Sequence, residues 1–478
     1  MGAKYIIKHA TVVSVDEAIG NVPNCDVLVE DGFIKAVGPE LQHSSEHVVI
    51  DAIDAIVSPG FIDTHRHAWQ TQLRTICTDF VLNDYILAVR HIFGSCYSPR
   101  DVYLGNYCGA LESIDNGITY LVDHSHIMNS PEHADAAING LRDARIRGTF
   151  CYGLYQNPAW EGSNMDAQRE SDPSWRLADA KRVRQKHFSS NGTDELLRFG
   201  VSPSEAEAIP FEQLVQEIEA ARSLGAAVIT AHVALGTYDW GHFTTQKLDQ
   251  MGLLGPDLLW SHANSLTADE LQAIRKHGVC LSATPDIELQ MGVGLPIAFK
   301  AKEFGCTPGI GIDITSNCPA DMFQQMRMLL QAQRYHDQVE TKTIPIAVTR
   351  KCSEVLEMAT MGGAKSVGLE KIIGSITPGK RADLLITKCR STRLAPVHDP
   401  VGALVLYANG SDVDSVFING ELVKSQGVLT NIDWPKLRKE LQESAASIMK
   451  TASYAPKQFL EDARNVMLRA TAIEEVKQ

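Results

Sequence analysis

SPGFIDTHRH, residues 58–67, is the stretch on which the interpretation of the whole chain depends. A Pro-Gly pair leads into a short apolar strand, and the strand ends at two histidines one residue apart. Side chains at positions i and i+2 of a strand point to the same side, so His65 and His67 can direct both imidazoles to one point. Neutral imidazole is a common ligand of zinc and iron. Two ordinary loop histidines would give the same pattern, so the pair alone is weak evidence.

The middle of the chain, residues 59–377, alternates short apolar strands with helical patterns, which predicts a parallel sheet. The eight strand candidates end near His67, Asp123, Tyr155, Ser202, His232, His262, Ser282 and Asp313. Eight such units predict an α/β fold of the (β/α)8 TIM-type barrel, in which catalytic groups lie at the C-terminal ends of the strands. The alternative is a doubly wound sheet whose polar strand ends are incidental.

The two ends of the chain contain similar β-rich segments. Residues 1–58 and 378–430 show short strands separated by turn signals, and neither segment is long enough to bury a core of its own. We therefore predict that both form one small composite β-sandwich domain. Residues 431–478 are predicted to be helical, because Asp433 can cap a helix and Pro435 can occupy its first turn.

Composition excludes several classes of partner. The formal net charge of the 478 residues is -14, which argues against nucleic acid, because phosphate binding needs a basic surface. The 10 cysteines include no Cys-x-x-Cys pair, which indicates reduced thiols. We find neither a signal-peptide pattern nor an apolar run of membrane-spanning length. The sequence predicts a cytoplasmic enzyme with a small-molecule substrate and no membrane partner.

The polar residues at the strand ends form a candidate metal site. Strand one ends with His65 and His67, strand five with His232, strand six with His262 and strand eight with Asp313. Around the mouth of a barrel these side chains would converge from distant parts of the sequence. Three imidazoles and a carboxylate leave a coordination position open for water, as a catalytic site needs and a closed structural site does not.

This pattern resembles the amidohydrolase superfamily, over nearly the whole chain. Residues 57–67 match its entry motif, and residues 374–385 match its return from the barrel to the small β-domain. Residues 73–100 and 110–119 are similar to the lid and second strand of the chlorohydrolase and deaminase branch. That branch includes triazine hydrolases and cytosine, guanine and adenosine-type deaminases.

The resemblance implies a role for each strand-end residue. His65, His67, His232 and Asp313 would bind one divalent metal ion, with Zn²⁺ preferred and Fe²⁺ the alternative. Asp313 would take the proton from the attacking water, and His262 would polarise the substrate. Residues 197–204 contain no lysine of the kind that binuclear members carboxylate, which favours a single metal. The resemblance also implies a homodimer or a homotetramer.

One position departs from the branch. Its usual His-x-Ala-Glu, whose glutamate protonates the leaving nitrogen, is replaced here by His232-Val233-Ala234-Leu235. Leucine cannot move a proton, so another residue supplies the acid, the leaving group needs none, or the chemistry differs. Asp286 and Glu288 are candidate substitutes near the predicted barrel mouth; the alternative is a helix cap and a surface salt bridge.

We predict four substrate-binding residues: His124, Glu288, Trp69 and Tyr155. His124 belongs to a second His-x-His, with His126, in which one ring would face the substrate while the other packs. A second metal at this pair is the alternative, and Asp123 is a candidate to orient a ligand histidine. The aromatic residues near strand ends would suit a flat or apolar substrate; core and lid packing is the alternative for each of them.

The leading hypothesis is a metal-dependent hydrolase that cleaves a non-peptide C–N or C–halogen bond of a small cyclic or aromatic molecule. A non-hydrolytic cyclase, decarboxylase or lyase is the second hypothesis, and the missing glutamate motivates it. The third is a catalytically silent binding protein, against which the intact ligand set argues. The fold alone does not choose among the three.

Overall fold

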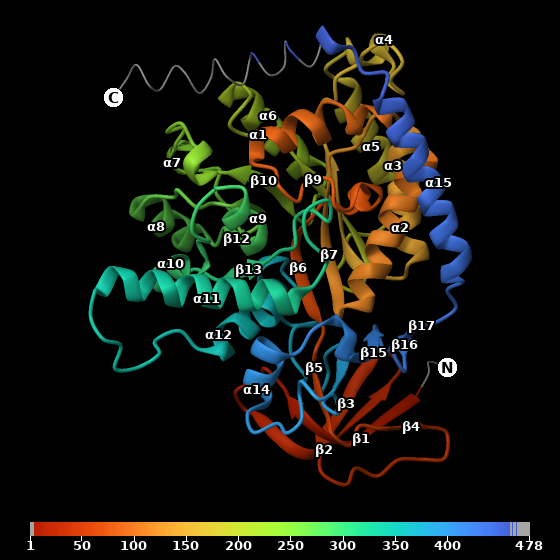
Figure 1. The fold of residues 1–478 in the computed structure, drawn as a ribbon, viewed down its shortest axis with the longest axis vertical. Helices are drawn as coiled ribbons and strands as arrows, with labels where there is room; N and C mark the ends of the chain where they lie inside the picture. The colour runs from red at the N-terminus through yellow and green to blue at the C-terminus, as the bar shows by residue number, and fades with distance from the viewer. Residues whose placement is uncertain (1–3, 459–460, 462–464, 466–478) are drawn as a thin grey trace.

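The computed structural model describes residues 4–458, 461 and 465. The chain forms a barrel with a β-sheet domain at one end and helices around its wall (Figure 1). The predicted C-terminal helical segment contains α15 (Trp434–Ala452), and most of residues 459–478 lie outside the described part.

The barrel is a closed ring of parallel strands in chain order. Its strands are β6 (Phe61–Arg66), β7 (Ile118–Ser125), β8 (Arg147–Gly153), β9 (Leu197–Ser202), β10 (Ile229–Val233), β11 (Leu258–His262), β12 (Cys280–Ala283) and β13 (Pro308–Ile310). They are almost entirely buried, because side chains fill the interior and helices cover the outside. The predicted TIM-type barrel is confirmed, and the doubly wound alternative is excluded.

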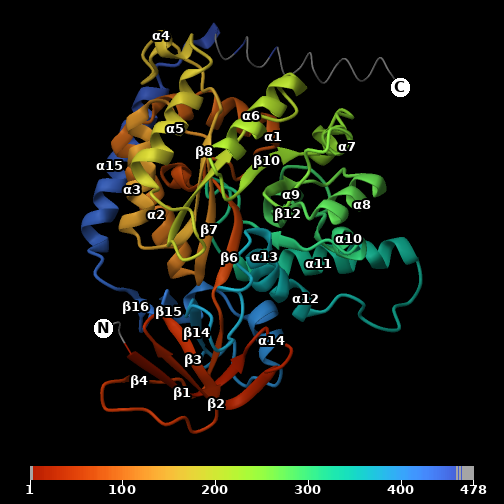
Figure 2. The same ribbon diagram turned by 180° about the vertical axis from the view of Figure 1, so that it is seen from behind.

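Helices cover the barrel from the outside, as Figure 2 shows from the opposite side. Along the chain they are α1 (Leu82–Tyr85), α2 (Pro99–Asp115), α3 (Pro131–Asp143), α4 (Ala167–Glu170), α5 (Trp175–His187), α6 (Phe211–Ser223), α7 (Thr244–Gln250), α8 (Ala268–His277), α9 (Pro285–Gln290), α10 (Ala298–Glu303), α11 (Met322–Thr341), α12 (Cys352–Glu357) and α13 (Gly363–Ser366). The short helix α14 (Pro400–Gly402) lies beside the β-sheet domain instead. The sequence of α8 shows how local residues set the ends of a helix. Thr267 and Glu270 form a reciprocal capping box at its start, and Gly278, with a φ of 72°, ends it.

Both chain ends build one connected sheet. The first segment gives β1 (Lys4–Val13), β2 (Asn21–Glu30), β3 (Phe33–Gly38), β4 (Val48–Asp51) and β5 (Ala55–Pro59), and the second gives β14 (Leu384–Lys388), β15 (Val413–Ile418), β16 (Glu421–Ser425) and β17 (Val428–Leu429). The order is β17-β16-β15-β14-β5-β1-β2-β3, with β4 on β1. β5 pairs with strands from both ends of the chain, and it leads directly into β6 of the barrel.

The C-terminal helix α15 packs on the barrel wall. Leu441 joins Leu104 and Cys108 of α2 in a small apolar cluster. The Ser444 hydroxyl donates to Asp101 over 2.6 Å. Among the described helices, none combines the length and the apolar character that a membrane crossing requires.

Candidate active site

Four side chains converge at the C-terminal mouth of the barrel. His65 and His67 come from the end of β6, His232 from β10, and Asp313 from the segment after β13. Nε2 of His65 and Nε2 of His67 lie 3.4 Å and 3.3 Å from Oδ1 of Asp313. Nε2 of His232 lies 3.3 Å from Nε2 of His65. All four are buried. Two overlapping groups of three donors could hold a metal ion: His65 with His67 and Asp313, and His65 with His232 and His262.

Backbone pairing places Asp313 beside β6. Its N–H donates to the carbonyl of His65, and its own carbonyl accepts from the N–H of His67. Asp313 and His262 both have a φ of 70°, in the left-handed region that non-glycine residues rarely adopt. Such a backbone costs about 1–3 kcal/mol per residue and clusters at functional sites.

The second ring nitrogen of each candidate ligand histidine has its own partner. Nδ1 of His65 lies 2.8 Å from the Ser261 hydroxyl, and Nδ1 of His67 donates to the His124 carbonyl over 2.7 Å. Nδ1 of His232 lies 3.2 Å from both carboxylate oxygens of Glu205. Outer partners of this kind fix a ring and direct Nε2 to a metal.

The protonation states suit a divalent cation. Burial lowers the pKa of His65 and of His67, so both rings are neutral near pH 7. Burial opposes ionisation of Asp313, but the close contacts with the rings of His65 and His67 hold its pKa well below the ordinary value. Neutral imidazoles and an ionised carboxylate are the ligand forms that a metal requires. The donor set therefore fits the implied metal.

His262 lies beside this cluster. Its Nε2 is 3.9 Å from Oδ2 of Asp313. Burial lowers the pKa of His262, but the neighbouring carboxylates of Glu288 and Asp313 outweigh burial and raise it. These carboxylates favour the protonated, cationic form of the His262 ring. The ring faces the same point as the four candidate ligands.

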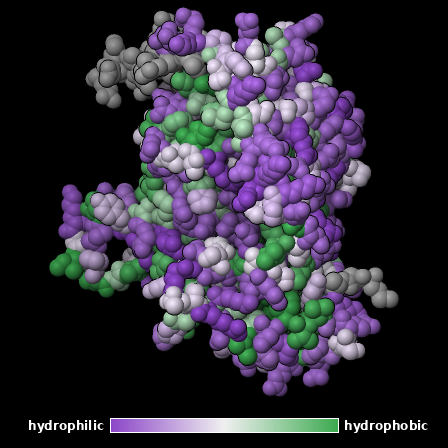
Figure 3. Space-filling model, turned by 45° about the vertical axis from the view of Figure 1, so that its right-hand side comes forward, coloured by the Kyte–Doolittle hydropathy of each residue, from purple (hydrophilic) through white to green (hydrophobic). Residues whose placement is uncertain are grey.

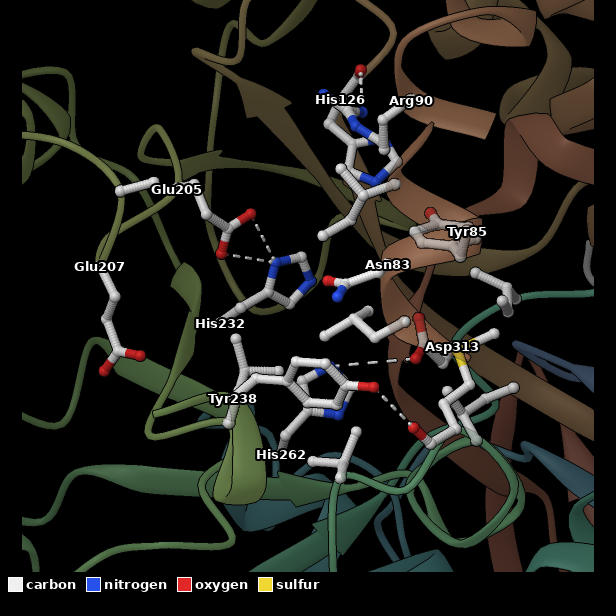
Figure 4. Close-up of a pocket in the computed structure, with 18 of the residues that line it drawn as sticks. Asn83, Tyr85, Arg90, His126, Glu205, Glu207, His232, Tyr238, His262 and Asp313 are labelled. Atoms are coloured by element: carbon white, nitrogen blue, oxygen red, sulfur yellow. Dashed lines mark hydrogen bonds and ion pairs between the residues drawn. The ribbon is translucent and has the colours of Figure 1, made fainter. Parts of the chain in front are cut away.

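A cavity of about 360 Å³ opens above the cluster, within the size range of small-molecule sites. His67, His232, His262 and Asp313 are among its lining residues, and Figure 4 shows the last three of them. Its aromatic lining residues are Tyr85, Tyr155, Tyr238 and Trp240. The arrangement can hold a flat ring against a metal centre and keep bulk water away from it.

The predicted substrate-binding residues separate into two groups. Tyr155 lines the cavity, and its hydroxyl lies 3.0 Å from Nε2 of His124. His124 is not among the lining residues: it stacks on His232 with ring centroids 4.5 Å apart. His126 lines the cavity instead and stacks on His67. The two histidines differ in position because His124 is still within β7, whereas His126 lies two residues farther toward the mouth.

Trp69 and Glu288 lie behind the cavity wall, although substrate contact was predicted for both. Trp69 is fully buried in the short 3-10 helix η1 (Ala68–Leu73), and its indole N–H donates to Nδ1 of His126 over 3.0 Å. Glu288 is fully buried behind His262. Strand-end reasoning locates such residues near the mouth, but it does not say at which depth.

Two other acidic candidates have structural partners. Asp123 accepts from the N–H of Ala68 and from the side chain of Asn106, so it holds the start of η1. It does not orient a candidate ligand ring, because the Nδ1 atoms of His65, His67 and His232 have the partners given above. Asp286 accepts from the side chain of Gln324, on the side of α11.

Some charged side chains of the cavity were not predicted from the sequence. Glu205 and Glu207 follow the end of β9, and Arg90 comes from the lid segment, where it stacks over the ring of Tyr155. Figure 4 shows the Glu205 carboxylate directed at His232. The strand-end rule would have found the two glutamates, had strand four been searched for carboxylates as well as for lysine. No periodicity marks Arg90.

Leu235 also lines the cavity, so an apolar side chain stands where the branch has its acid. The nearby Glu207 accepts from the N–H of Ala234 over 2.8 Å. Burial, together with the charges of Asp239 and Glu205, raises the pKa of Glu207 to about 7.

Comparison with known proteins adds independent information. The model of the Amidohydrolase family matches residues 56–423. A 5'-deoxyadenosine deaminase from Methanosarcina mazei is 27% identical over 457 residues, which are 94% of this chain and 99% of that protein. A 5-methylthioadenosine/S-adenosylhomocysteine deaminase from Pyrococcus furiosus is 27% identical over 441 residues, or 90% of this chain and 98% of that protein.

Solved structures share the fold. An adenosine deaminase from Xanthomonas campestris with bound zinc has a TM-score of 0.79 at 21% identity, over 94% of this chain and 99% of that one. Atrazine chlorohydrolase from Arthrobacter aurescens, complexed with zinc, has a TM-score of 0.79 at 20% identity, over 92% of this chain and 100% of that one.

Proposed function

Because the chain belongs to the amidohydrolase family and is a metal-dependent hydrolase of non-peptide C–N or C–halogen bonds, we propose that it removes an amino group from a nitrogen heterocycle. The observation that carries the proposal is the convergence of His65, His67, His232 and Asp313 beside an aromatic cavity, which the last three of them line. We propose one Zn²⁺ at this point, with Fe²⁺ as the alternative; the zinc-bound structures of similar fold support this choice.

The side chains divide the work of the reaction. A divalent metal held by these four residues would supply a water acidic enough to act as a nucleophile near pH 7. Asp313 accepts the proton of the attacking water. His262 faces both Oδ2 of Asp313 and the cavity, so it can stabilise charge on the substrate ring and pass a proton on. Tyr155, Tyr238 and Trp240 hold the ring flat and exclude water.

Adenine nucleosides with a modified 5' position are the proposed substrate class. Several related proteins are named as 5'-deoxyadenosine or 5-methylthioadenosine deaminases. The aromatic walls suit a purine ring, and Glu205, Glu207 and Gln156 offer hydrogen-bond acceptors on the cavity wall. Such acceptors match the hydroxyl groups of a ribose.

Leu235 favours a second candidate reaction, the hydrolysis of a chlorinated heterocycle. Ammonia leaves only after the nitrogen gains a proton, whereas chloride leaves without one. With leucine at this position, a halide is therefore a better leaving group than an amine, because the halide needs no proton donor.

We also propose that the protein is a cytoplasmic homodimer or homotetramer. The ten free thiols agree with a reducing compartment. The end of α11 and the following loop project from the barrel, and apolar residues gather on this arm in Figure 3. Its exposed residues include Tyr335, Ile344 and Ile346. The mass in solution, measured by light scattering, tests this part.

The activity is tested with the purified protein, loaded with Zn²⁺. Release of ammonia from 5'-deoxyadenosine and 5'-methylthioadenosine, and of chloride from a chlorotriazine, is measured for the wild type and for His65→Ala. Turnover in ¹⁸O-labelled water that places the label in the product, and that His65→Ala abolishes, supports the proposal. Turnover without label would indicate a non-hydrolytic reaction.

A further inference from the structure

Glu288 is a buried carboxylate on the far side of His262 from the cavity. It lies on α9, directly after β12, and it is fully buried. Its Oε1 accepts from the backbone N–H of Thr284 over 2.8 Å. Within the described part of the chain, Oε2 has no hydrogen-bond partner. Burial of a carboxylate with an unpartnered oxygen costs free energy, so a second role for this side chain deserves a test.

The second contact of Glu288 is with the His262 ring. Nδ1 of His262 lies 3.0 Å from the Thr284 hydroxyl and 3.4 Å from Oε1 of Glu288. Nε2, on the opposite edge of the ring, lies 3.9 Å from Oδ2 of Asp313. The ring therefore bridges a buried carboxylate and the candidate metal centre. A residue that holds Nδ1 also decides where Nε2 points.

The backbone of His262 makes such support necessary. His262 and Ala263 have φ angles of 70° and 60°, so β11 ends in two successive left-handed residues. His262 is the last residue of the strand, so its side chain projects from the point where the strand ends. Thr284 and Glu288 are the partners that fix its Nδ1 edge within the described structure.

We propose that Glu288 is a positioning residue for His262: its carboxylate holds the Nδ1 edge, so that Nε2 faces Asp313 and the substrate ring. This inference rests on the proposed function of the same site. The carboxylate that the branch carries after strand five is Leu235 here, and this chain has a buried carboxylate behind His262 instead.

A purely local role is the competing explanation, since the bond from the Thr284 N–H also caps the start of α9. Glu288→Gln keeps an oxygen for this N–H and the shape of the side chain, but it removes the charge. Glu288→Ala removes both. Asp286→Asn is the matched control, because Asp286 is a buried acid on the same helix that faces Gln324 and not His262.

The kinetic experiment compares the three variants with the wild type, each loaded with Zn²⁺. For Glu288→Ala we expect kcat to fall about 10–100-fold, the usual effect of losing an outer partner, with KM changed by less than about twofold. The kcat of Glu288→Gln should lie between those of Glu288→Ala and the wild type. This variant still tests the proposal if Glu288→Ala does not fold. Metal content and Asp286→Asn kinetics should stay at the wild-type level. An unchanged kcat, or a loss that only follows metal loss, would overturn the proposal.

A crystal structure of metal-free Glu288→Ala gives a readout that needs no substrate. We expect the His262 ring to be rotated or to occupy more than one orientation, while it keeps one orientation in Asp286→Asn. A single, unmoved ring in Glu288→Ala would contradict the positioning role. This readout stands even if none of the tested compounds is a substrate, which would count against the proposed function alone.

Discussion

The residues on the metal-binding side of the site and those on its proton-handling side are positioned by different parts of the fold. The four candidate ligands all lie at or just after the ends of barrel strands, and each ligand histidine has a fixed outer partner. The proton-handling groups are less regular: Leu235 replaces an acid, and Glu288 acts from a helix behind the wall. The positions of the ligands follow from the barrel itself, whereas the supply of a proton to the leaving group depends on segments beyond the strand ends, which the barrel constrains less.

The largest effect expected is that of Asp313→Asn. This change removes a candidate ligand and the proton acceptor together, so kcat should fall about 10³–10⁴-fold. Steady-state kinetics at saturating metal measure it. A fall of less than about tenfold would show that Asp313 neither binds the metal nor accepts the proton.

Glu205→Gln should act on the metal-binding side alone. Loss of the charged partner of His232 Nδ1 should weaken metal affinity about 10–100-fold, as measured by competition with a chelator. Glu207→Gln is its control, because Glu207 contacts the N–H of Ala234 and not a ligand ring. Equal affinities in both variants would remove Glu205 from the metal centre.

Leu235→Glu should act on the proton-handling side alone. A carboxyl group at this position could protonate a leaving amine, so we expect ammonia release to rise by up to about tenfold while chloride release stays unchanged. Leu235→Gln has a similar size and cannot donate in this way, so it should show no gain. A gain in both reactions would point to altered substrate binding instead.

The smallest expected effect is a change in the pH dependence of stability when Glu207 is replaced. Its pKa is raised to about 7 by burial and by Asp239 and Glu205, so the folded protein binds more protons than the unfolded chain between about pH 4.5 and 7. Stability should therefore fall as the pH rises through this window. Glu207→Gln should flatten this part of a plot of Tm against pH. A slope identical to that of the wild type would show that Glu207 titrates normally.

The sequence predicted the barrel, and it indicated that the candidate ligands would lie close together, for a physical reason. The two-residue period of a strand puts His65 and His67 on one side, and parallel strands end at one rim, so residues far apart in sequence had to meet there. What it could not predict was depth along the barrel axis. His124 and His126 differ by two residues, yet only His126 lines the cavity.

Contacts between separate loops could not be predicted from the sequence either. Nothing in the sequence links Glu205 to His232, or Ser261 to His65, because both pairs form only when the barrel closes. The same holds for the projection of Glu288 away from the cavity. The sequence identified it as a candidate acid from its place after strand seven, but its direction depends on how α9 packs.

The most direct test of the central claim is the metal content, per mole of chain, of the protein purified without added metal, for the wild type and for His67→Ala. We expect about one zinc or iron in the wild type and a loss of that metal in the variant, because His67 belongs with His65 and Asp313 to a group whose donor atoms could hold an ion. About two metals in the wild type, or metal retained in His67→Ala, would contradict the mononuclear centre described above.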